Sequence, residues 1–235
     1  MPDIVIVGSG DIGSLSSAIS NISSNTIIKL SGDSDSYGIS VPSNSSFVLD
    51  LNDSGIQLHR NANNEYAGSS GTKTNGFQFL AGSNISIQNG EISADDTKIL
   101  VQNYSNLTLK DVVLKGSSSD TYVLSNNFGQ VHLKGTTQIL ATGDVGGKEN
   151  VAFDLWYGMS AVYDAGVSVF IDDPTVVIQG PIEFGHASRI TSEEQFLKNT
   201  HLYVCRSYDL SSLRIPAGYH WEVAANNMYE LRPGS

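Results

Sequence analysis

The chain has one cysteine and few basic residues. Cys205 stands alone, so an intramolecular disulfide is impossible and the fold cannot depend on oxidation. The 13 Lys and Arg are outnumbered by 24 Asp and Glu, which gives a formal net charge of -11. A protein that binds nucleic acid needs a basic face that neutralises phosphates. The composition therefore argues against nucleic acid as a partner.

Long apolar runs and common catalytic motifs are also absent. No run approaches the roughly 20 residues of a membrane-spanning helix. The start of the chain, MPDIVIVGSGD, lacks the basic and apolar regions of a secretory signal peptide. The patterns H-x-x-x-H and C-x-x-C and the serine nucleophile elbow are missing as well. We therefore expect a chain made in the cytoplasm, with no signal peptide, no membrane contact, no cofactor and no metal.

A G-x-G-x-x-G pattern at residues 8–13 follows an apolar run, and Asp33 stands about 20 residues downstream, as in a dinucleotide-binding unit. The next segment, SLSSAISNISSN, is short and rich in Ser and Asn, which are mediocre in helix interiors. Its apolar residues recur at helical spacing and support one or two turns; they are Leu15, Ala18, Ile19 and Ile22. Little helical periodicity follows, so we expect a loop between a strand and a capping helix, not a nucleotide site.

Pairs of apolar residues, with one residue between them, recur through the chain. The pairs are Ile28/Leu30, Leu49/Leu51, Ile85/Ile87, Leu107/Leu109, Val131/Leu133 and Val169/Ile171. Their steps are 21, 36, 22, 24 and 38 residues, and the two long steps span the polar segments 59–76 and 141–150. A solenoid tolerates such insertions as surface loops. The pattern predicts stacked parallel strands with these side chains inside and Ser86, Thr108, His132 and Phe170 outside. A leucine-rich repeat is the competing solenoid, but its L-x-x-L-x-L-x-x-N signature is missing.

The stretch SAISNISSNTIIKLSGDSDSYGISVPSNSSFVLDLNDSGIQL resembles the start of a pectate-lyase-like right-handed β-helix. Such chains often begin with a short amphipathic helix that is followed by strands of the l-D-L-N type. The resemblance covers residues 14–190. It implies an all-β fold with an N-terminal strand and cap over 1–25, a right-handed parallel β-helix over 26–190, and a C-terminal cap or oligomerisation segment over 191–235.

The same resemblance suggests catalytic candidates. The polygalacturonase pattern runs N-x-D, D-D, G-H-G and R-x-K, and fragments of the last three recur in order as Asp172, Asp173, His186 and Arg189. Ala187 replaces the second glycine, and no lysine closes the motif. The 13 residues from Asp173 to His186 make about half a coil, which places these side chains on different faces. We therefore expect a turn at Asp172 and Asp173, a packed or solvated His186, and no enzyme.

A column of turn acids is the candidate for a calcium site. Asp53, Asp111 and Asp173 take equivalent places in successive repeats, but Asn89 and Gly135 interrupt them. Calcium-assisted chemistry would need carboxylates from adjacent coils. The broken column therefore argues against a metal site.

Aromatic residues gather in two segments. Trp156, Tyr157 and Tyr163 lie in 150–166, and Tyr219, Trp221 and Tyr229 lie near the C-terminus. Core filling, a subunit interface and contact with sugar rings would each suit them. The C-terminal segment also predicts a helical turn capped by Ser192, a last coil at 202–204 and a hairpin. Such a cap covers the open end of a solenoid or joins copies of the chain.

Three functions stay open. A cysteine-poor, Ser-, Asn- and Gly-rich β-helix resembles bacteriophage appendage proteins. That resemblance implies a non-enzymatic virion protein (head fibre, decoration protein or tail-fibre component), made in the host cytoplasm. It would form a homo-oligomer, most simply a trimer, and contact other virion proteins and a host-surface glycan. The alternatives are a polysaccharide-degrading enzyme or tailspike and a bacterial surface adhesin.

Overall fold

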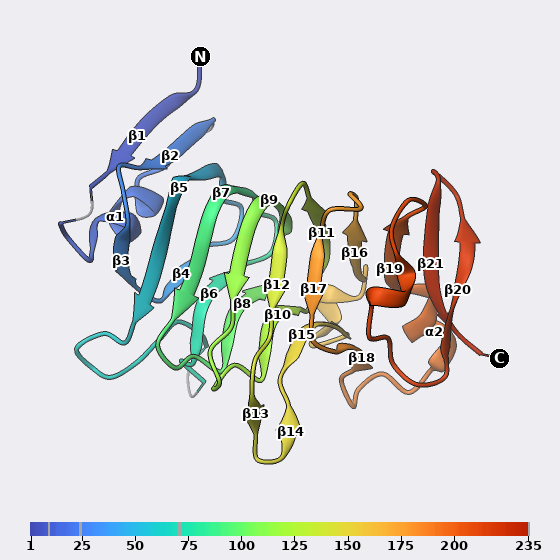
Figure 1. The fold of residues 1–235 in the computed structure, drawn as a ribbon. Coiled ribbons are helices and arrows are strands. Elements are labelled where there is room, and N and C mark those ends of the chain that lie inside the picture. Colours follow the sequence, from blue (N-terminus) through green and yellow to red (C-terminus); the bar gives the residue numbers. More distant parts are fainter. Residues whose placement is uncertain (9, 24, 70–71, 235) are drawn as a thin grey trace.

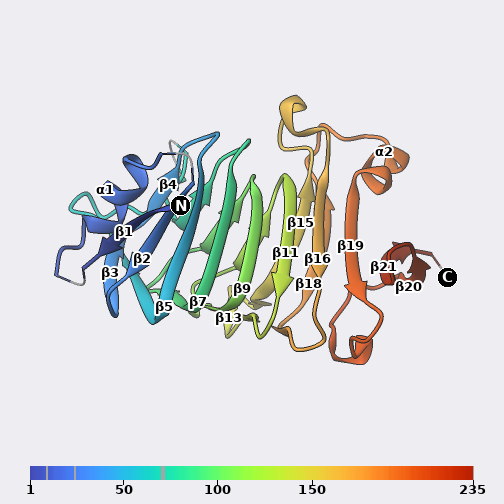
Figure 2. The same ribbon diagram turned by 90° about the horizontal axis from the view of Figure 1, so that it is seen from above.

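A computed structural model describes residues 1–8, 10–23, 25–69 and 72–234 of the chain. Strands hold 53% of the residues and helices 8%, so the fold is mostly β, as the sequence predicted. The strands form a 13-stranded sheet, a six-stranded sheet and a two-stranded hairpin. Figures 1 and 2 show the strands side by side, progressing from the N-terminal end in blue to the C-terminal end in red.

The 13-stranded sheet is parallel along the path β1-β2-β5-β7-β9-β11-β16-β19. Its strands are β1 (Asp3–Val7), β2 (Thr26–Leu30), β3 (Ser34–Tyr37), β5 (Ser46–His59), β7 (Asn84–Ala94), β9 (Asn106–Lys115), β11 (Gly129–Lys134), β12 (Gln138–Leu140), β16 (Val167–Ile171), β17 (Val177–Gln179), β19 (Thr200–Cys205), β20 (Tyr219–Ala224) and β21 (Met228–Pro233). Only the last two join it in antiparallel fashion.

The six-stranded sheet is parallel throughout, in the order β18-β15-β10-β8-β6-β4. Its strands are β4 (Ile39–Val41), β6 (Asn75–Phe79), β8 (Ile99–Asn103), β10 (Tyr122–Asn126), β15 (Val151–Tyr157) and β18 (Ile182–His186). Each follows strands of the larger sheet and precedes the next ones, so the chain passes from one sheet to the other about once per repeat.

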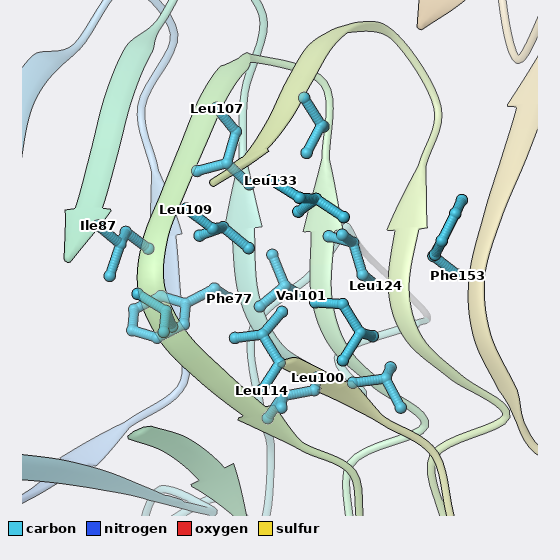
Figure 3. Close-up of a cluster of buried hydrophobic side chains, with 14 of the residues drawn as sticks. Phe77, Ile87, Leu100, Val101, Leu107, Leu109, Leu114, Leu124, Leu133 and Phe153 are labelled. Atoms are coloured by element: carbon cyan, nitrogen blue, oxygen red, sulfur yellow. The ribbon is translucent and has the colours of Figure 1, made fainter. Parts of the chain in front are cut away.

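The core lies between the two sheets (Figure 3). Aliphatic strand residues such as Leu109 and Leu133 come from the larger sheet, and Phe77 and Phe153 come from the smaller one; all four are fully buried. Branched and aromatic side chains favour strands because they pack well on a pleated surface. The last four predicted pairs are confirmed, since 85/87, 107/109, 131/133 and 169/171 stack in register.

The first two predicted pairs are wrong by two residues. Ile28 is in register with Leu49, and Leu49 is in register with Ile87. Ile28 therefore takes the second position of its pair, and the true second pair is Phe47/Leu49 instead of Leu49/Leu51. Side chains alternate with a period of two, so a shift by two residues leaves the same side chains inside. The apolar pattern alone could not distinguish the two registers.

The N-terminal end is covered by helix α1 (Ser14–Ser20), which packs against β1 and β3. Leu15 and Ile19 are buried, and Ala18 and Ile22 lie partly buried against the same core, so the predicted helix is confirmed. The glycine motif connects β1 to α1, and its Ser9 lies outside the described residues. Strands follow α1, where a dinucleotide-binding fold would continue with further helices packed on its sheet.

The C-terminal elements match the sequence prediction. The Ser192 hydroxyl accepts a hydrogen bond from Gln195 N at 3.1 Å and begins helix α2 (Glu193–Lys198). Strand β19 pairs in parallel with β16, and the hairpin β20–β21 then covers β19. Parallel pairing therefore reaches the strand at 202–204 that the sequence predicted as a last coil.

The two predicted insertions have defined structure. Strand β5 runs through His59 and β6 begins at Asn75, so the first insertion is 60–74, of which residues 70 and 71 lie outside the described residues. Tyr66 in this insertion is buried, and its hydroxyl donates to Asp96 Oδ1 at 2.9 Å. The second insertion, 141–150, contains the hairpin β13 (Asp144–Val145) and β14 (Lys148–Glu149), which projects from the sheets in Figure 1.

Candidate functional site on the outer face of the six-stranded sheet

The four residues that the polygalacturonase pattern suggested lie apart. Asp172 and Asp173 follow β16 of the larger sheet, whereas His186 ends β18 of the smaller one. Asp172 Oδ2 lies 2.7 Å from His132 Nδ1. Arg189 donates to a carboxylate of the loop after β15 at 2.7 Å. Each side chain thus has its own structural partner, and no common reaction centre forms among these four.

The column of turn residues is present, and two of its acids accept hydrogen bonds from the backbone. Four of its residues adopt the left-handed backbone conformation with positive φ: Asp53, Asn89, Asp111 and Gly135. Asp111 Oδ1 accepts from Thr136 N at 2.9 Å, and Asp173 Oδ2 accepts from Gly135 N at 2.6 Å. These carboxylates therefore connect one repeat to the next. Within the described ranges, no group of three or more His, Cys, Asp or Glu side chains is placed to hold a metal ion.

The aromatic residues of segment 150–166 divide between the core and the surface. Tyr157 is fully buried and its hydroxyl donates to Asp164 O at 3.0 Å, so it belongs to the core and is no ligand contact. Tyr163 packs on Tyr104, with 4.8 Å between ring centroids. Trp156 is half-buried on the outer face. These three candidates therefore have three different surroundings.

The C-terminal aromatic candidates pack within the cap. The Tyr219 ring meets Phe184 edge-on at 5.1 Å, and Trp221 packs against the hydrophobic core. Tyr229 lies under the Arg206 guanidinium, 4.6 Å from its ring centroid. All three stay half-buried. Their contacts account for them as cap residues within one chain.

A row of polar side chains crosses the outer face of the smaller sheet. In register these residues, called the polar row below, are Ser40, Gln78, Gln102, Ser125, Asp154 and Glu183. Ser40 Oγ donates to Gln78 Oε1 at 2.9 Å, and Gln78 Nε2 donates to Gln102 Oε1 at 3.0 Å. Gln102 Nε2 in turn donates to Asn127 Oδ1 at 3.0 Å. Amides and carboxylates are thus held at fixed spacing along the face.

Trp156 lies beside this row. Phe153 and Leu155 are fully buried in the core, so the alternation of the strand turns Asp154 and Trp156 outward. Trp156 is in register with Gly185, and a side-chain carbon at Gly185 would overlap the indole. The ring therefore lies over the glycine backbone. An aromatic ring next to hydroxyl-bonding groups is an arrangement that suits a sugar.

Asp154 is the most perturbed carboxyl of the face. It is 3% exposed, and its Oδ1 accepts from Asn126 N at 3.0 Å. Burial raises the pKa of Asp154 to about 7, against the lowering effect of hydrogen bonds from Ser125 and Asn126, and the nearby Glu183 carboxylate adds to the rise. A carboxyl in this state exchanges its proton near neutral pH, which gives it potential as an acid or a base.

Three side chains meet over the outer face of β15, the strand that carries Asp154: Tyr122, Glu183 and Lys148. The Tyr122 hydroxyl donates to Glu183 Oε2 at 3.2 Å, and Lys148 Nζ lies 3.0 Å from Glu183 Oε1. Burial is also the main cause of the raised pKa of Tyr122. Because β15 lies between β10 and β18, the contact between Tyr122 and Glu183 crosses β15 on the side toward which Asp154 points. This accounts for the low exposure of Asp154.

The sequence analysis singled out Trp156 but missed Asp154, Glu183, Tyr122 and Lys148. One signal was present in VAFDLWY at 151–157, where a single acid interrupts an apolar strand. A buried carboxyl needs compensating partners and is therefore worth attention. Its partners on the neighbouring strands come from 28 to 32 residues away in the chain, and the sequence did not provide the register of those strands.

Comparisons with protein-family models, with curated proteins and with solved structures find no match to this chain. No helix within residues 1–8, 10–23, 25–69 and 72–234 has the length and apolar character to cross a membrane.

Proposed function

We propose that the chain is a right-handed parallel β-helix and serves as a non-enzymatic structural protein of a bacteriophage virion that contacts a host-surface glycan. Three features support a solenoid: two parallel sheets that the chain visits in alternation, one continuous core between them, and a cover at each end. Stacked repeats of this kind make a stiff and elongated body. Such a body suits a fibre or decoration protein.

The observation that carries the glycan contact is the pairing of Trp156 with the polar row. The indole supplies an apolar surface for a sugar ring, and the half-buried Glu183 carboxylate offers a hydrogen-bond acceptor on the same face. Hydrogen bonds within the chain already occupy the four residues of the polygalacturonase pattern, Asp172, Asp173, His186 and Arg189. This supports a binding role over a catalytic one.

A homo-oligomer, most simply a trimer, is part of the proposal. Val223 lies on β20, the outermost strand of the C-terminal hairpin, and is 71% exposed. An edge strand with an apolar side chain favours pairing with another chain. Light scattering at micromolar concentration tests this: a trimer supports the proposal, and a monomer for both the full chain and Val223→Lys removes self-association from it.

A polysaccharide-degrading enzyme is the second candidate because of one observation. Asp154, with its pKa raised to about 7, stands in register with Glu183 on the next strand. Two carboxyl groups, one of which keeps its proton near neutral pH, are the usual requirement for glycoside hydrolysis. This candidate places the chemistry on the outer face, away from Asp172 and His186.

The test measures binding and turnover together. The purified chain is passed over immobilised bacterial capsular and lipopolysaccharide glycans, and released oligosaccharides are measured in the eluate. Retention without release supports the binding protein. Release that stops in Asp154→Asn supports the enzyme, and a chain that neither binds nor cleaves contradicts the glycan contact.

A further inference from the structure

The arginines of this chain are already engaged. Carboxylates of sugar acids are commonly bound by the planar fork of a guanidinium. Four of the five arginines pair with carboxylates: Arg60 with Asp96, Arg189 with Asp164, Arg214 with Glu149 and Arg232 with Glu230. The fifth, Arg206, donates to Met228 O at 2.7 Å and lies over an aromatic ring. In the described part of the chain, every guanidinium therefore has a partner.

The outer face of the smaller sheet has the same charge pattern. Lys148 reaches it from the β13–β14 hairpin, but its ammonium is bound to Glu183 at 3.0 Å. Lys98 is exposed just before β8 and offers one ammonium on a flexible stem. Against these stands the Glu183 carboxylate within the row itself, in a chain of net charge -11, whereas the Asp154 carboxyl is buried. An anionic ligand beside Trp156 would meet the Glu183 carboxylate, because Lys98 is separated from β15 by β10.

The groups that are exposed on this face suit hydroxyls. A carboxylate accepts hydrogen bonds, so Glu183 complements the hydroxyl groups of an uncharged sugar, whereas the Gln102 amide is already engaged within the chain. Trp156 adds a half-buried ring beside them. A sugar that carries its own carboxylate would instead place a hydrogen-bond acceptor next to the acceptor groups of the protein.

We infer that the outer face of the six-stranded sheet binds an uncharged, hydroxyl-rich glycan around Trp156 and Glu183, and that it rejects polymers of sugar acids. The inference rests on the glycan contact proposed above and adds the class of sugar and the place of binding. Selectivity against anionic polymers comes from the Glu183 carboxylate, which also occupies Lys148. Removal of that carboxylate should change the selectivity.

The test compares one polymer in two charge states. A neutral galactan and the same galactan after oxidation of its primary hydroxyls to carboxylates are titrated against the full chain at 50 mM salt. We expect the neutral form to bind and the oxidised form to bind at least roughly tenfold more weakly. Trp156→Ala should weaken the neutral complex by roughly tenfold or more, as truncation of a central aromatic contact does. Tyr229→Ala, on the C-terminal hairpin, is the matched aromatic control and should leave binding unchanged.

Glu183→Gln gives the selective readout. It removes one carboxylate and frees Lys148, so binding of the oxidised galactan should rise several-fold while the neutral form still binds. Glu222→Gln, on the C-terminal hairpin, is the matched control and should change neither. Equal or tighter binding of the oxidised form by the natural chain would overturn the inference and leave the glycan contact standing. Binding that survives Trp156→Ala would overturn the location, and failure to bind either polymer would remove the glycan contact together with this inference.

Discussion

Replacing Asp154 by asparagine should stabilise the protein above about pH 4, and most at neutral and alkaline pH. Asparagine has nearly the shape of the protonated carboxyl and retains an oxygen that accepts from Asn126 N, at 3.0 Å in the natural chain. The folded protein raises the pKa of Asp154 from its ordinary 3.8 to about 7. Between these two values the folded state holds a proton that the unfolded state has released, so stability falls as the pH rises through this window.

The size of the effect follows from the same two values. At about 1.36 kcal/mol for each tenfold change in proton affinity, the difference costs the folded state up to about 4 kcal/mol above pH 7. The side chain is 3% exposed, so solvent screening reduces this figure little. Asp154→Asn should therefore raise the free energy of unfolding by a few kcal/mol at pH 8.5 and by almost nothing at pH 4.

Urea denaturation at the two pH values measures this difference. Asp144→Asn, an exposed carboxyl on the β13–β14 hairpin, is the matched control and should behave alike at both. Asp120, whose pKa burial raises to about 6, contributes to the same trend in both proteins and cancels in the comparison. An Asp154→Asn protein that is no more stable than the natural chain at pH 8.5 would refute the reasoning. Equal gains at both pH values would do the same, because the gain would then be independent of charge.

Further predictions concern the core, a histidine contact and the indole support. Leu109→Ala should lower the free energy of unfolding by about 2–5 kcal/mol in denaturant titration, because the side chain is fully buried and leaves a cavity. His59 contacts Asp35 and Asp95 at 2.7 Å each through its two ring nitrogens, and its pKa is raised chiefly by the Asp35 bond. Stability from this contact, about 0.5–1 kcal/mol after solvent screening, should be present below pH 6.5 and lost as the pH rises through the raised pKa; in His59→Gln that part of the pH dependence should vanish. Gly185→Leu should displace the indole and change tryptophan fluorescence without lowering the melting temperature by more than a few degrees.

Much of the architecture could be predicted from the sequence because stacked repeats leave a regular trace. The apolar pairs 107/109 and 131/133 belong to adjacent repeats of almost equal length, and they stack as predicted. The register failed where spacing was irregular, as at Leu49, because a two-residue shift keeps the same faces buried. Local signals made three elements predictable: helical spacing for the helix at 14–20, a capping serine for the helix at 193–198, and turn residues for the hairpin at 219–233.

The candidate site was predictable only in part. Trp156 stood out by residue type, whereas Asp154 and Glu183 needed a register between strands that lie 29 residues apart. Family motifs led to Asp172 and His186, which belong to different sheets. The order of these residues along the sequence therefore resembled a catalytic pattern, but the stacked strands do not bring the residues together.

The stacking of repeats also limits where a ligand can bind. Asp111 and Asp173 bind backbone of the neighbouring repeat, so these two corners cannot lose their carboxylates to a ligand without loosening two repeats. The outer face of the smaller sheet differs because its row ends in two carboxyls, Asp154 and Glu183, side by side. One of them is kept near its point of titration by burial. Polar side chains that are not needed for contacts between repeats are therefore concentrated beside Trp156, and a binding function is best sought there.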